Sequence, residues 1–287
     1  MNRRTYIRTA GTALSGLALA PSMYHGCSGM KDPLHQIGLI TNVVQESIRQ
    51  DPRGTLSRLA EMGYSYLEFG GTWGEDPGSL LSFMKGIGIL PLAGGTSMAA
   101  LQGDGLQQSI EDALTMEKSY LVCYWPWMDS AENLTTDQVK RAVDQLQEIG
   151  EACNSNGLRF AMHNHEKEFQ QLEGELVYNY ILDHTDPELV TMEVDLYWAY
   201  KGGADIGEIF KAHPGRFELV HVKDSTDSSD MRSFACVGSG ILDFPDLLSY
   251  RDVAGFRHLI VEHDQPQPEE ELECARSSLV YLQGLKF

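Results

Sequence analysis

Apolar residues are arranged along the chain in two alternating patterns. Short continuous apolar runs separate longer segments in which apolar positions recur every three or four residues, as in Val139, Val143, Leu146 and Ile149. The first pattern is typical of buried strands and the second of amphipathic helices. Together they predict strands at residues 36–41, 66–69, 90–93, 120–125, 159–163, 190–195, 217–222 and 258–262.

Residues with special backbone preferences mark the helix boundaries. Helix starts are predicted where a short polar residue precedes a proline or an acidic first turn, at Asp51-Pro52, Asp76-Pro77 and Thr135-Thr136-Asp137. Glycine adopts the left-handed conformation that closes many helices, so helix ends are predicted at Gly63, Gly86 and Gly157.

Eight strands that alternate with helices predict a single (β/α)8 barrel, the TIM barrel. The chain has 287 residues, which suits one such domain, and no low-complexity linker marks a second one. A doubly wound open sheet is the alternative, and it is less favoured because no Gly-x-Gly-x-x-Gly turn follows the first strand. We interpret the pairs Gly70-Gly71 and Gly94-Gly95 as turns and not as phosphate-binding loops.

The first 27 residues have the pattern of an export signal. The pair Arg3-Arg4 is followed by an uncharged stretch over residues 9–24. This stretch is shorter than the ~18 apolar residues that a membrane-spanning helix needs, and the arginine pair resembles a twin-arginine leader. We therefore expect a leader over residues 1–27, a barrel over residues 28–287, and export to the periplasm. A lipid anchor at Cys27 is an alternative end point for the leader.

Acidic residues outnumber basic ones, with 41 Asp and Glu against 22 Lys and Arg and a net charge of −19. This excess argues against nucleic acid or an anionic membrane as a partner, because both attract clustered basic residues. We expect a small neutral or cationic ligand instead.

The cysteines that follow the leader are widely spaced, at Cys123, Cys153, Cys236 and Cys274. Because no Cys-x-x-Cys motif is present, a zinc ribbon or a thioredoxin-type site is disfavoured. We interpret these residues as buried thiols, and the sequence leaves every disulfide pairing open.

Residues with metal-binding side chains end four consecutive predicted strands, at His163, Asp195, His221 and Glu262. The C-terminal strand ends form the active-site face of a TIM barrel, so we expect these groups to converge. Imidazole nitrogens and carboxylate oxygens without thiolates favour a divalent cation, namely Mn²⁺, Mg²⁺, Co²⁺ or Zn²⁺. The alternative is a ring of solvated polar strand ends.

At these strand ends the sequence resembles a known family, the xylose isomerase-like barrels of sugar phosphate isomerases and epimerases. The resemblance extends from residue 63 to residue 262. It rests on His163-Asn164-His165, Glu193-Val194-Asp195, Lys201-Gly202-Gly203, His221-Val222-Lys223-Asp224, Gly238-Ser239-Gly240 and Val261-Glu262, which occur in the family's order. It implies a metal-dependent TIM-barrel enzyme that acts on a carbohydrate.

The resemblance assigns Asp195, His221 and Glu262 to three of the four metal ligands of such enzymes. The fourth is commonly a glutamate at the end of the fifth strand, where this chain has His163. Either His163 or the nearby Glu168 is therefore expected to complete the set. His165 matches a position at which related members place a histidine that contacts substrate.

The implied chemistry is proton transfer next to a carbonyl. Removing that proton leaves an enediolate, which a bound cation would stabilise while a nearby base holds the proton. The predicted acid–base groups are His163, His165 and Glu262. Lys223 is predicted to place a positive charge near the carbonyl oxygen, and its alternative role is an ion pair with Asp224.

The substrate is predicted to be a non-phosphorylated carbohydrate. Tryptophans follow several strand ends, where their rings can stack on a sugar, and we expect Trp125 and Trp198, together with Glu68, to contact substrate. No phosphate-binding glycine loop is found, and the acidic surface would repel a phosphate group.

The leading hypothesis is a metal-dependent isomerase or epimerase. The departure at His163-Asn164-His165 supports the alternative of a lyase or dehydratase acting on a keto-glycoside or an inosose. A carbohydrate-binding barrel without catalytic activity is a third hypothesis. A metal-dependent endonuclease, which shares this barrel, is disfavoured by the net charge of −19. The oligomeric state stays open.

Overall fold

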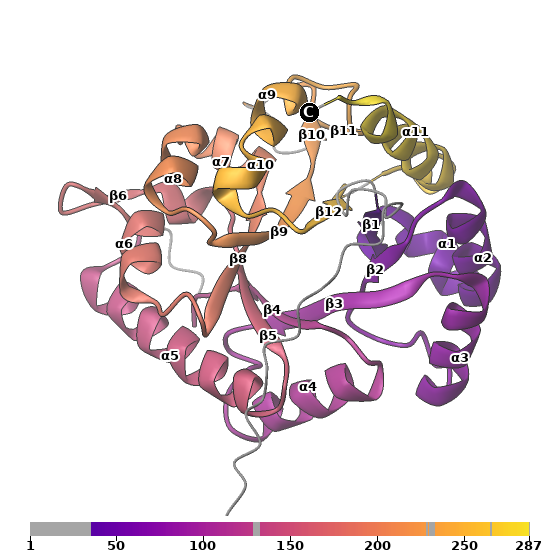
Figure 1. Cartoon of the computed structure of the whole chain (residues 1–287), viewed down its shortest axis with the longest axis horizontal. Helices are drawn as coiled ribbons and strands as arrows, with labels where there is room; N and C mark the ends of the chain where they lie inside the picture. The colour runs from indigo at the N-terminus through magenta and orange to yellow at the C-terminus, as the bar shows by residue number, and fades with distance from the viewer. Residues whose placement is uncertain (1–35, 129–132, 228, 230–232, 265, 287) are drawn as a thin grey trace, which may run out of the picture. The chain divides into compact units, whose positions relative to one another are not determined.

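The computed structural model describes residues 36–128, 133–227, 229, 233–264 and 266–286. The predicted leader, with Arg3, Arg4 and Cys27, lies outside the described residues. From Ile37 onward the chain forms a closed barrel of parallel strands with helices around it, which confirms the predicted single (β/α)8 barrel (Figure 1). Within this described part, no helix has the length and apolar character that crossing a membrane requires.

The barrel strands are neighbours in the order β1-β12-β9-β8-β5-β4-β3-β2, and all their pairings are parallel. Their bounds are β1 (Ile37–Ile40), β2 (Tyr66–Glu68), β3 (Leu90–Ser97), β4 (Tyr120–Trp125), β5 (Arg159–His163), β8 (Val190–Asp195), β9 (Phe217–Val222) and β12 (His258–Val261). Two antiparallel ribbons lie outside the barrel, formed by β6 (Gln171–Leu172) with β7 (Glu175–Leu176), and by β10 (Asp224–Ser225) with β11 (Phe234–Ala235).

Helices follow the strands and pack around the barrel, and Figure 1 shows the last helix beside the first. The α-helices are α1 (Gln45–Gln50), α2 (Pro52–Met62), α3 (Pro77–Ile87), α4 (Asp104–Thr115), α5 (Thr136–Ser155), α6 (Val177–His184), α7 (Leu196–Lys201), α8 (Ile206–Ala212), α9 (Phe244–Ser249), α10 (Arg251–Ala254) and α11 (Glu271–Gly284). The short 3-10 turns are η2 (Thr41–Val44) and η3 (Glu166–Phe169).

The predicted helix starts are confirmed by capping side chains. The Asp51 carboxylate accepts the Gly54 amide at the start of α2, and Asp76 and Thr135 cap α3 and α5 in the same way. Gly63 ends α2 in the left-handed region, as predicted, with φ of 112°. The predicted end at Gly86 was wrong, because α3 continues to Ile87 and Gly88 supplies the left-handed residue.

The glycine pair at residues 94 and 95 belongs to a strand and not to a turn, so β3 is longer than the predicted 90–93. A Cβ at Gly95 would lie 1.7 Å from the Val122 carbonyl oxygen, and one at Gly94 would lie 2.0 Å from that of Phe69. Only glycine permits this approach between neighbouring strands.

The segment between β9 and α9 is organised by one buried carboxylate. Asp224 is 1% exposed, and its oxygens accept backbone N–H groups from Gly238, Gly240, Ile241 and Leu242. A Cβ at Gly240 would lie 2.1 Å from Asp224 Oδ1, so the glycine is needed for this close wrapping. The Gly238-Ser239-Gly240 motif therefore binds the Asp224 carboxylate through its backbone amides.

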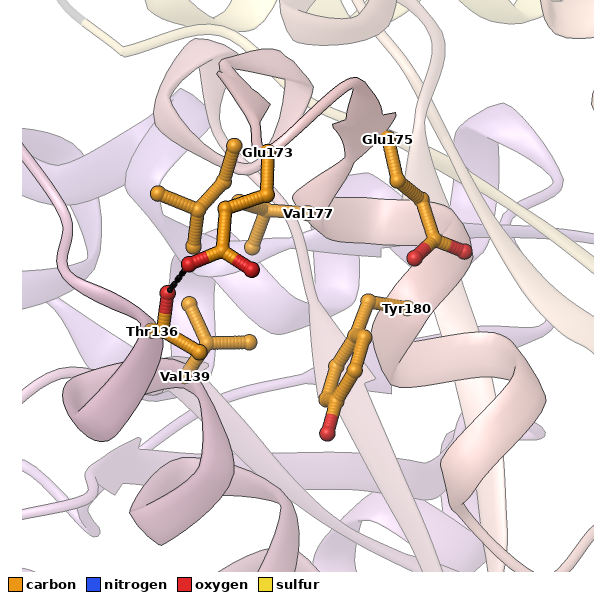
Figure 2. A pocket seen from close by; sticks show the side chains of 7 residues that line it. Thr136, Val139, Glu173, Glu175, Val177 and Tyr180 are labelled. Carbon is orange, nitrogen blue, oxygen red and sulfur yellow. Dashed lines mark hydrogen bonds between the residues drawn. The ribbon is translucent and has the colours of Figure 1, made fainter.

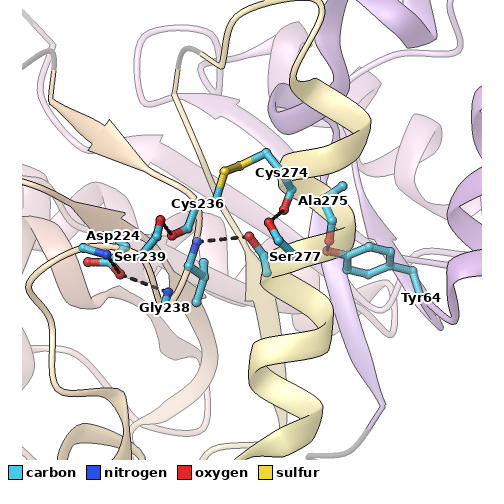
Figure 3. The surroundings of a disulfide bond; sticks show 11 residues. Tyr64, Asp224, Cys236, Gly238, Ser239, Cys274, Ala275 and Ser277 are labelled. Atoms are coloured by element: carbon cyan, nitrogen blue, oxygen red, sulfur yellow. Dashed lines mark hydrogen bonds between the residues drawn. A yellow bond between two sulfur atoms is a disulfide. The ribbon is translucent and has the colours of Figure 1, made fainter.

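A disulfide joins Cys236, just after β11, to Cys274 in α11 (Figure 3). The expectation of buried thiols was wrong for this pair, whose members are 38 residues apart and 5.2 Å apart between Cα atoms. It is confirmed for Cys123 and Cys153, which are free and buried. The bond ties the segment organised by Asp224 to the last helix.

Replacing Asp224 by alanine should lower the free energy of unfolding by about 3–5 kcal/mol, because several buried backbone amides lose a charged acceptor. Urea or thermal unfolding measures the loss. Asp205→Ala is the matched control, since its carboxylate accepts the single amide of Glu208 at the start of α8, and it should cost about 1 kcal/mol. Equal losses in the two variants would contradict the organising role of Asp224.

Candidate active site

The C-terminal ends of neighbouring strands place the polar side chains at similar levels in the barrel. His163 in β5 is the register partner of Glu193 in β8, and Asp195 in β8 is the partner of His221 in β9. Glu193 and Asp195 lie two positions apart, so both point to the same face of β8. The expected convergence of these strand ends is thus a direct result of the pairing register.

Three buried side chains form a group with the geometry of a metal site, namely His163, Glu193 and His221. One ligand atom from each lies within 4.8 Å of the others. His163 Nδ1 is 3.1 Å from Glu193 Oε2, and His221 Nε2 is 3.5 Å from the same oxygen. Two imidazoles and one carboxylate are suited to a divalent cation.

Further carboxylates flank His221. Its Nε2 lies 3.1 Å from Glu68 Oε2, and its Nδ1 lies 3.0 Å from Glu262 Oε2. The Tyr124 hydroxyl donates a hydrogen bond of 2.5 Å to Glu68 Oε1. His221 in β9 therefore contacts carboxylates from the ends of β2 and β12.

Burial and mutual repulsion shape the protonation of this group. Burial raises the pKa of Glu193 well above its usual range, and repulsion from Glu68 adds to the shift. Burial lowers the pKa of His163 well below its usual value. Burial acts in the same direction on His221, but the Glu193 and Glu68 carboxylates outweigh it and raise its pKa.

Two unpaired carboxylate oxygens, one in this group and one beside it, fit a cation. Glu193 Oε1 and Asp195 Oδ2 are buried and have no hydrogen-bond partner among the described residues. Buried carboxylate oxygens are costly without a donor or a positive charge. A divalent ion would satisfy such oxygens and reduce the repulsion between Glu193 and Glu68.

Asp195, a predicted ligand, lies next to this group and not within it. Its Oδ1 accepts the Trp198 amide and caps α7, while its Oδ2 is 3.9 Å from Lys223 Nζ. Burial raises the pKa of Asp195 to about 7. One oxygen of this carboxylate is therefore committed to the backbone and the other faces Lys223.

Glu168 lies in η3, and both of its oxygens accept hydrogen bonds. One accepts the Trp127 indole N–H at 2.5 Å and the other accepts the His165 amide at 2.7 Å. Of the two residues predicted as alternatives for the fourth ligand, His163 is the one that groups with Glu193 and His221.

His165 stands among aromatic rings. Its ring centroid is 5.4 Å from Trp125, 5.5 Å from Trp198 and 5.0 Å from His163. Burial lowers the pKa of His165 to about 4, so the imidazole is neutral at pH 7. Its Nδ1 has no hydrogen-bond partner among the residues that the structure describes.

Lys223 is 1% exposed and pairs with Asp264 as well as with Asp195. Burial lowers its pKa, but the carboxylates of Asp195, Glu262 and Asp264 outweigh this and raise it. The alternative of an ion pair with Asp224 was wrong, because that carboxylate accepts backbone amides. Lys223 is therefore held as a cation within the site.

A cavity of about 320 Å³ opens onto these groups. It is lined by Ile40, Thr41, Asn42, Phe69, Gly70, Tyr124, His163, His165, Trp198, His221, Lys223, Glu262 and Asp264. Trp198 thus faces the cavity as predicted for a substrate contact. Glu68 and Trp125 are absent from the lining; Glu68 contacts His221, and Trp125 packs against His165.

A second, smaller hollow on the barrel's outside carries none of the predicted site residues. It lies between the start of α5, the β6–β7 ribbon and α6, where the Thr136 hydroxyl donates to Glu173 (Figure 2). Its volume is about 160 Å³. We therefore assign the candidate active site to the cavity at the strand ends, which the predicted site residues line.

Sequence reasoning missed Glu193, Tyr124 and Asp264 as members of the site. Glu193 carried a usable signal, because it shares its strand face with Asp195, two positions later. Tyr124 likewise precedes the end of β4. Asp264 lies beyond β12, and its pairing with Lys223 depends on the path of the loop.

The fold and the site define a TIM-barrel protein with a candidate divalent-metal centre at its strand ends. The chain belongs to the xylose isomerase-like TIM barrel family, whose model matches residues 56–279.

Among characterised proteins, the inosose dehydratase of Geobacillus kaustophilus is 26% identical over 251 residues, which cover 73% of this chain and 79% of that protein. A sugar phosphate isomerase/epimerase structure from Parabacteroides distasonis superposes with a TM-score of 0.73 at 23% identity, covering 92% of this chain and 98% of that one. The IolI protein, solved with a bound zinc atom, gives 0.71 at 16% identity, covering 86% and 98%.

Glu193→Gln should lower the affinity for Zn²⁺ or Mn²⁺ by at least about 100-fold, since losing even an outer partner of a metal ligand costs about 10–100-fold. Calorimetric titration and the metal content of dialysed protein measure the effect. Glu168→Gln is the matched control and should keep the metal, because its carboxylate is engaged by Trp127 and His165. Equal affinities in wild type and Glu193→Gln would rule out the proposed centre.

Proposed function

We propose that the protein is a divalent-metal-dependent isomerase or epimerase that moves a proton next to the carbonyl group of a non-phosphorylated carbohydrate. The observation that carries the proposal is the shared cavity. A neutral imidazole at His165, a cation at Lys223 and two of the three metal-type side chains, His163 and His221, all line it.

The metal would be held by His163, Glu193 and His221, with Asp195 and Glu262 as the adjacent carboxylates. A divalent cation at this place would polarise the carbonyl oxygen and stabilise the negative charge that develops there. The zinc atom in the similarly folded IolI protein supports this assignment.

His165 is suited to act as the base. Its pKa of about 4 leaves the ring unprotonated at pH 7, and the imidazole lines the cavity. Lys223 is suited to hold an oxygen of the substrate, because three carboxylates keep its ammonium group charged. At pH 7 the His165 ring can thus accept a proton while the Lys223 ammonium group supplies a positive charge.

The lining of the cavity favours an uncharged sugar. Glu262 and Asp264 add negative charge to it, and Lys223, the one lysine or arginine in the lining, is already paired with Asp264. A phosphate group would be repelled by these carboxylates. Trp198 and Phe69 add apolar ring surface of the kind that stacks on sugars.

A dehydratase is the second candidate, and the relatives named inosose dehydratase favour it. The position at which related enzymes commonly have a glutamate is His163 here, which removes one of the two carboxylates that an epimerase uses. Dehydration needs one base for the proton next to the carbonyl and one acid for the departing hydroxyl group. Lys223, which is held as a cation in the same cavity, is placed to supply that acid.

We also propose that the protein is exported to the periplasm, with lipid attachment at Cys27 as the alternative end of the leader. The Cys236–Cys274 disulfide supports an oxidising compartment.

Proton exchange in deuterated buffer separates these functions. The metal-loaded protein is incubated with non-phosphorylated ketoses and inososes and followed by NMR. Deuterium next to the carbonyl without loss of water supports the isomerase or epimerase, and loss of water supports the dehydratase. Binding without either change supports the non-catalytic barrel and contradicts both enzyme proposals.

His165→Gln should lower the rate of this exchange about 10²–10⁴-fold, the usual contribution of a general base. The exposed His184→Gln on α6 is the matched control and should leave the rate unchanged. Because the pKa of His165 is about 4, protonation of this base should not limit the rate between about pH 6 and 8, and the rate should fall as pH approaches 4. A rate that His165→Gln leaves intact would exclude this base.

A further inference from the structure

Lys223 is enclosed by aromatic rings in addition to carboxylates. Its Nζ lies 4.6 Å from the ring centroid of Trp198, 4.8 Å from that of Phe234 and 5.9 Å from that of Tyr197. A desolvated ammonium group gains from each such ring face. The lysine is therefore restricted on several sides although its stem is intrinsically flexible.

Of these three rings, Phe234 is the one that does not come from α7. It lies in β11, opposite Ser225 in β10, so the ribbon folds back beside the lysine. Its ring also packs edge-on against Tyr197, Trp198 and His263, at centroid distances of 5.6, 6.1 and 6.0 Å. Phe234 thus connects the ribbon with the ends of two barrel strands.

The ribbon is attached to α11 immediately after Phe234. Cys236 forms the disulfide with Cys274 (Figure 3). The Val237 amide donates to the Ser278 hydroxyl at 3.0 Å. At Gly238, with φ of 85°, a Cβ would lie 2.3 Å from the Tyr281 ring. Three successive residues that follow the ribbon are therefore next to one helix.

We propose that Phe234 is a positioning residue for Lys223 and that the Cys236–Cys274 disulfide holds it in place from α11. Removing the ring opens one side of the enclosure, so the ammonium group gains rotamers and access to water. Removing the disulfide has the same effect at a distance, because the ribbon is then attached to α11 by noncovalent contacts. The role of a restrained Lys223 in catalysis rests on the proposed function, whereas the restraint of its side chain by Phe234 does not.

Reductive methylation of lysines, followed by peptide mass mapping, measures the accessibility of Lys223 directly and needs no substrate. We expect Lys223 to be protected in the wild-type protein and to react about tenfold faster in Phe234→Ala, the scale set by losing a desolvated cation–π contact. Phe234→Tyr should restore protection. Cys236→Ser with Cys274→Ser should resemble Phe234→Ala, and wild type reduced by a phosphine replaces this variant if it does not fold.

Two other lysines serve as controls. Lys85 is exposed and should react in every sample. Lys118 donates to the Phe69 carbonyl on the other side of the barrel, and its reactivity should not change. Protection of Lys223 in Phe234→Ala overturns the proposal, as does an equal rise for Lys118, which would indicate general loosening.

The proton-exchange assay then tests the consequence for function. If exchange is observed, Phe234→Ala should raise KM or lower kcat about tenfold, and Phe234→Tyr should recover the loss. Changed labelling of Lys223 with no exchange by any variant supports the positioning role and contradicts the proposed function. If Phe234→Ala increases the labelling of Lys223 but leaves proton exchange unchanged, the restraint of Lys223 is not important for catalysis.

Discussion

The arrangement of the strand ends depends on how buried carboxylates are compensated around His221. Glu68, Glu193 and Glu262 approach this one ring from different strands, and all of them are nearly inaccessible to solvent. Placing like charges together in a low-dielectric interior is costly unless cations or hydrogen-bond donors lie between them. The apolar packing in the rest of the barrel therefore has to offset the cost of burying these three carboxylates together.

The segments outside the barrel reinforce this region. The Asp224 carboxylate accepts hydrogen bonds from backbone amides that follow β11, and the disulfide attaches the same segment to α11. Asp224 directly follows Lys223 just beyond β9, and the disulfide is formed at Cys236, just after β11. The polar centre is thus surrounded by covalent and charge-assisted links, which limit the movement of its side chains.

The barrel and most strand bounds were predictable, because apolar periodicity and turn residues are local signals. The polar strand ends were predictable as a set because parallel strands bring their C-terminal ends together. The ion pair of Lys223 with Asp224 was wrong since the partners of Asp224 come from residues 238–242, which spacing does not reveal. The disulfide was missed for the same reason, because its cysteines are 38 residues apart.

His165 and Lys223 show how one cavity sets two protonation states. Both side chains are buried against Trp198, and burial alone disfavours the charged form of each. Around Lys223 three carboxylates reverse that effect, whereas around His165 burial prevails and lowers the pKa to about 4. The difference comes from where the acidic residues lie and not from the chemistry of the aromatic walls. A carboxylate moved next to His165 would turn this neutral acceptor into a second cation and leave the cavity without its unprotonated imidazole.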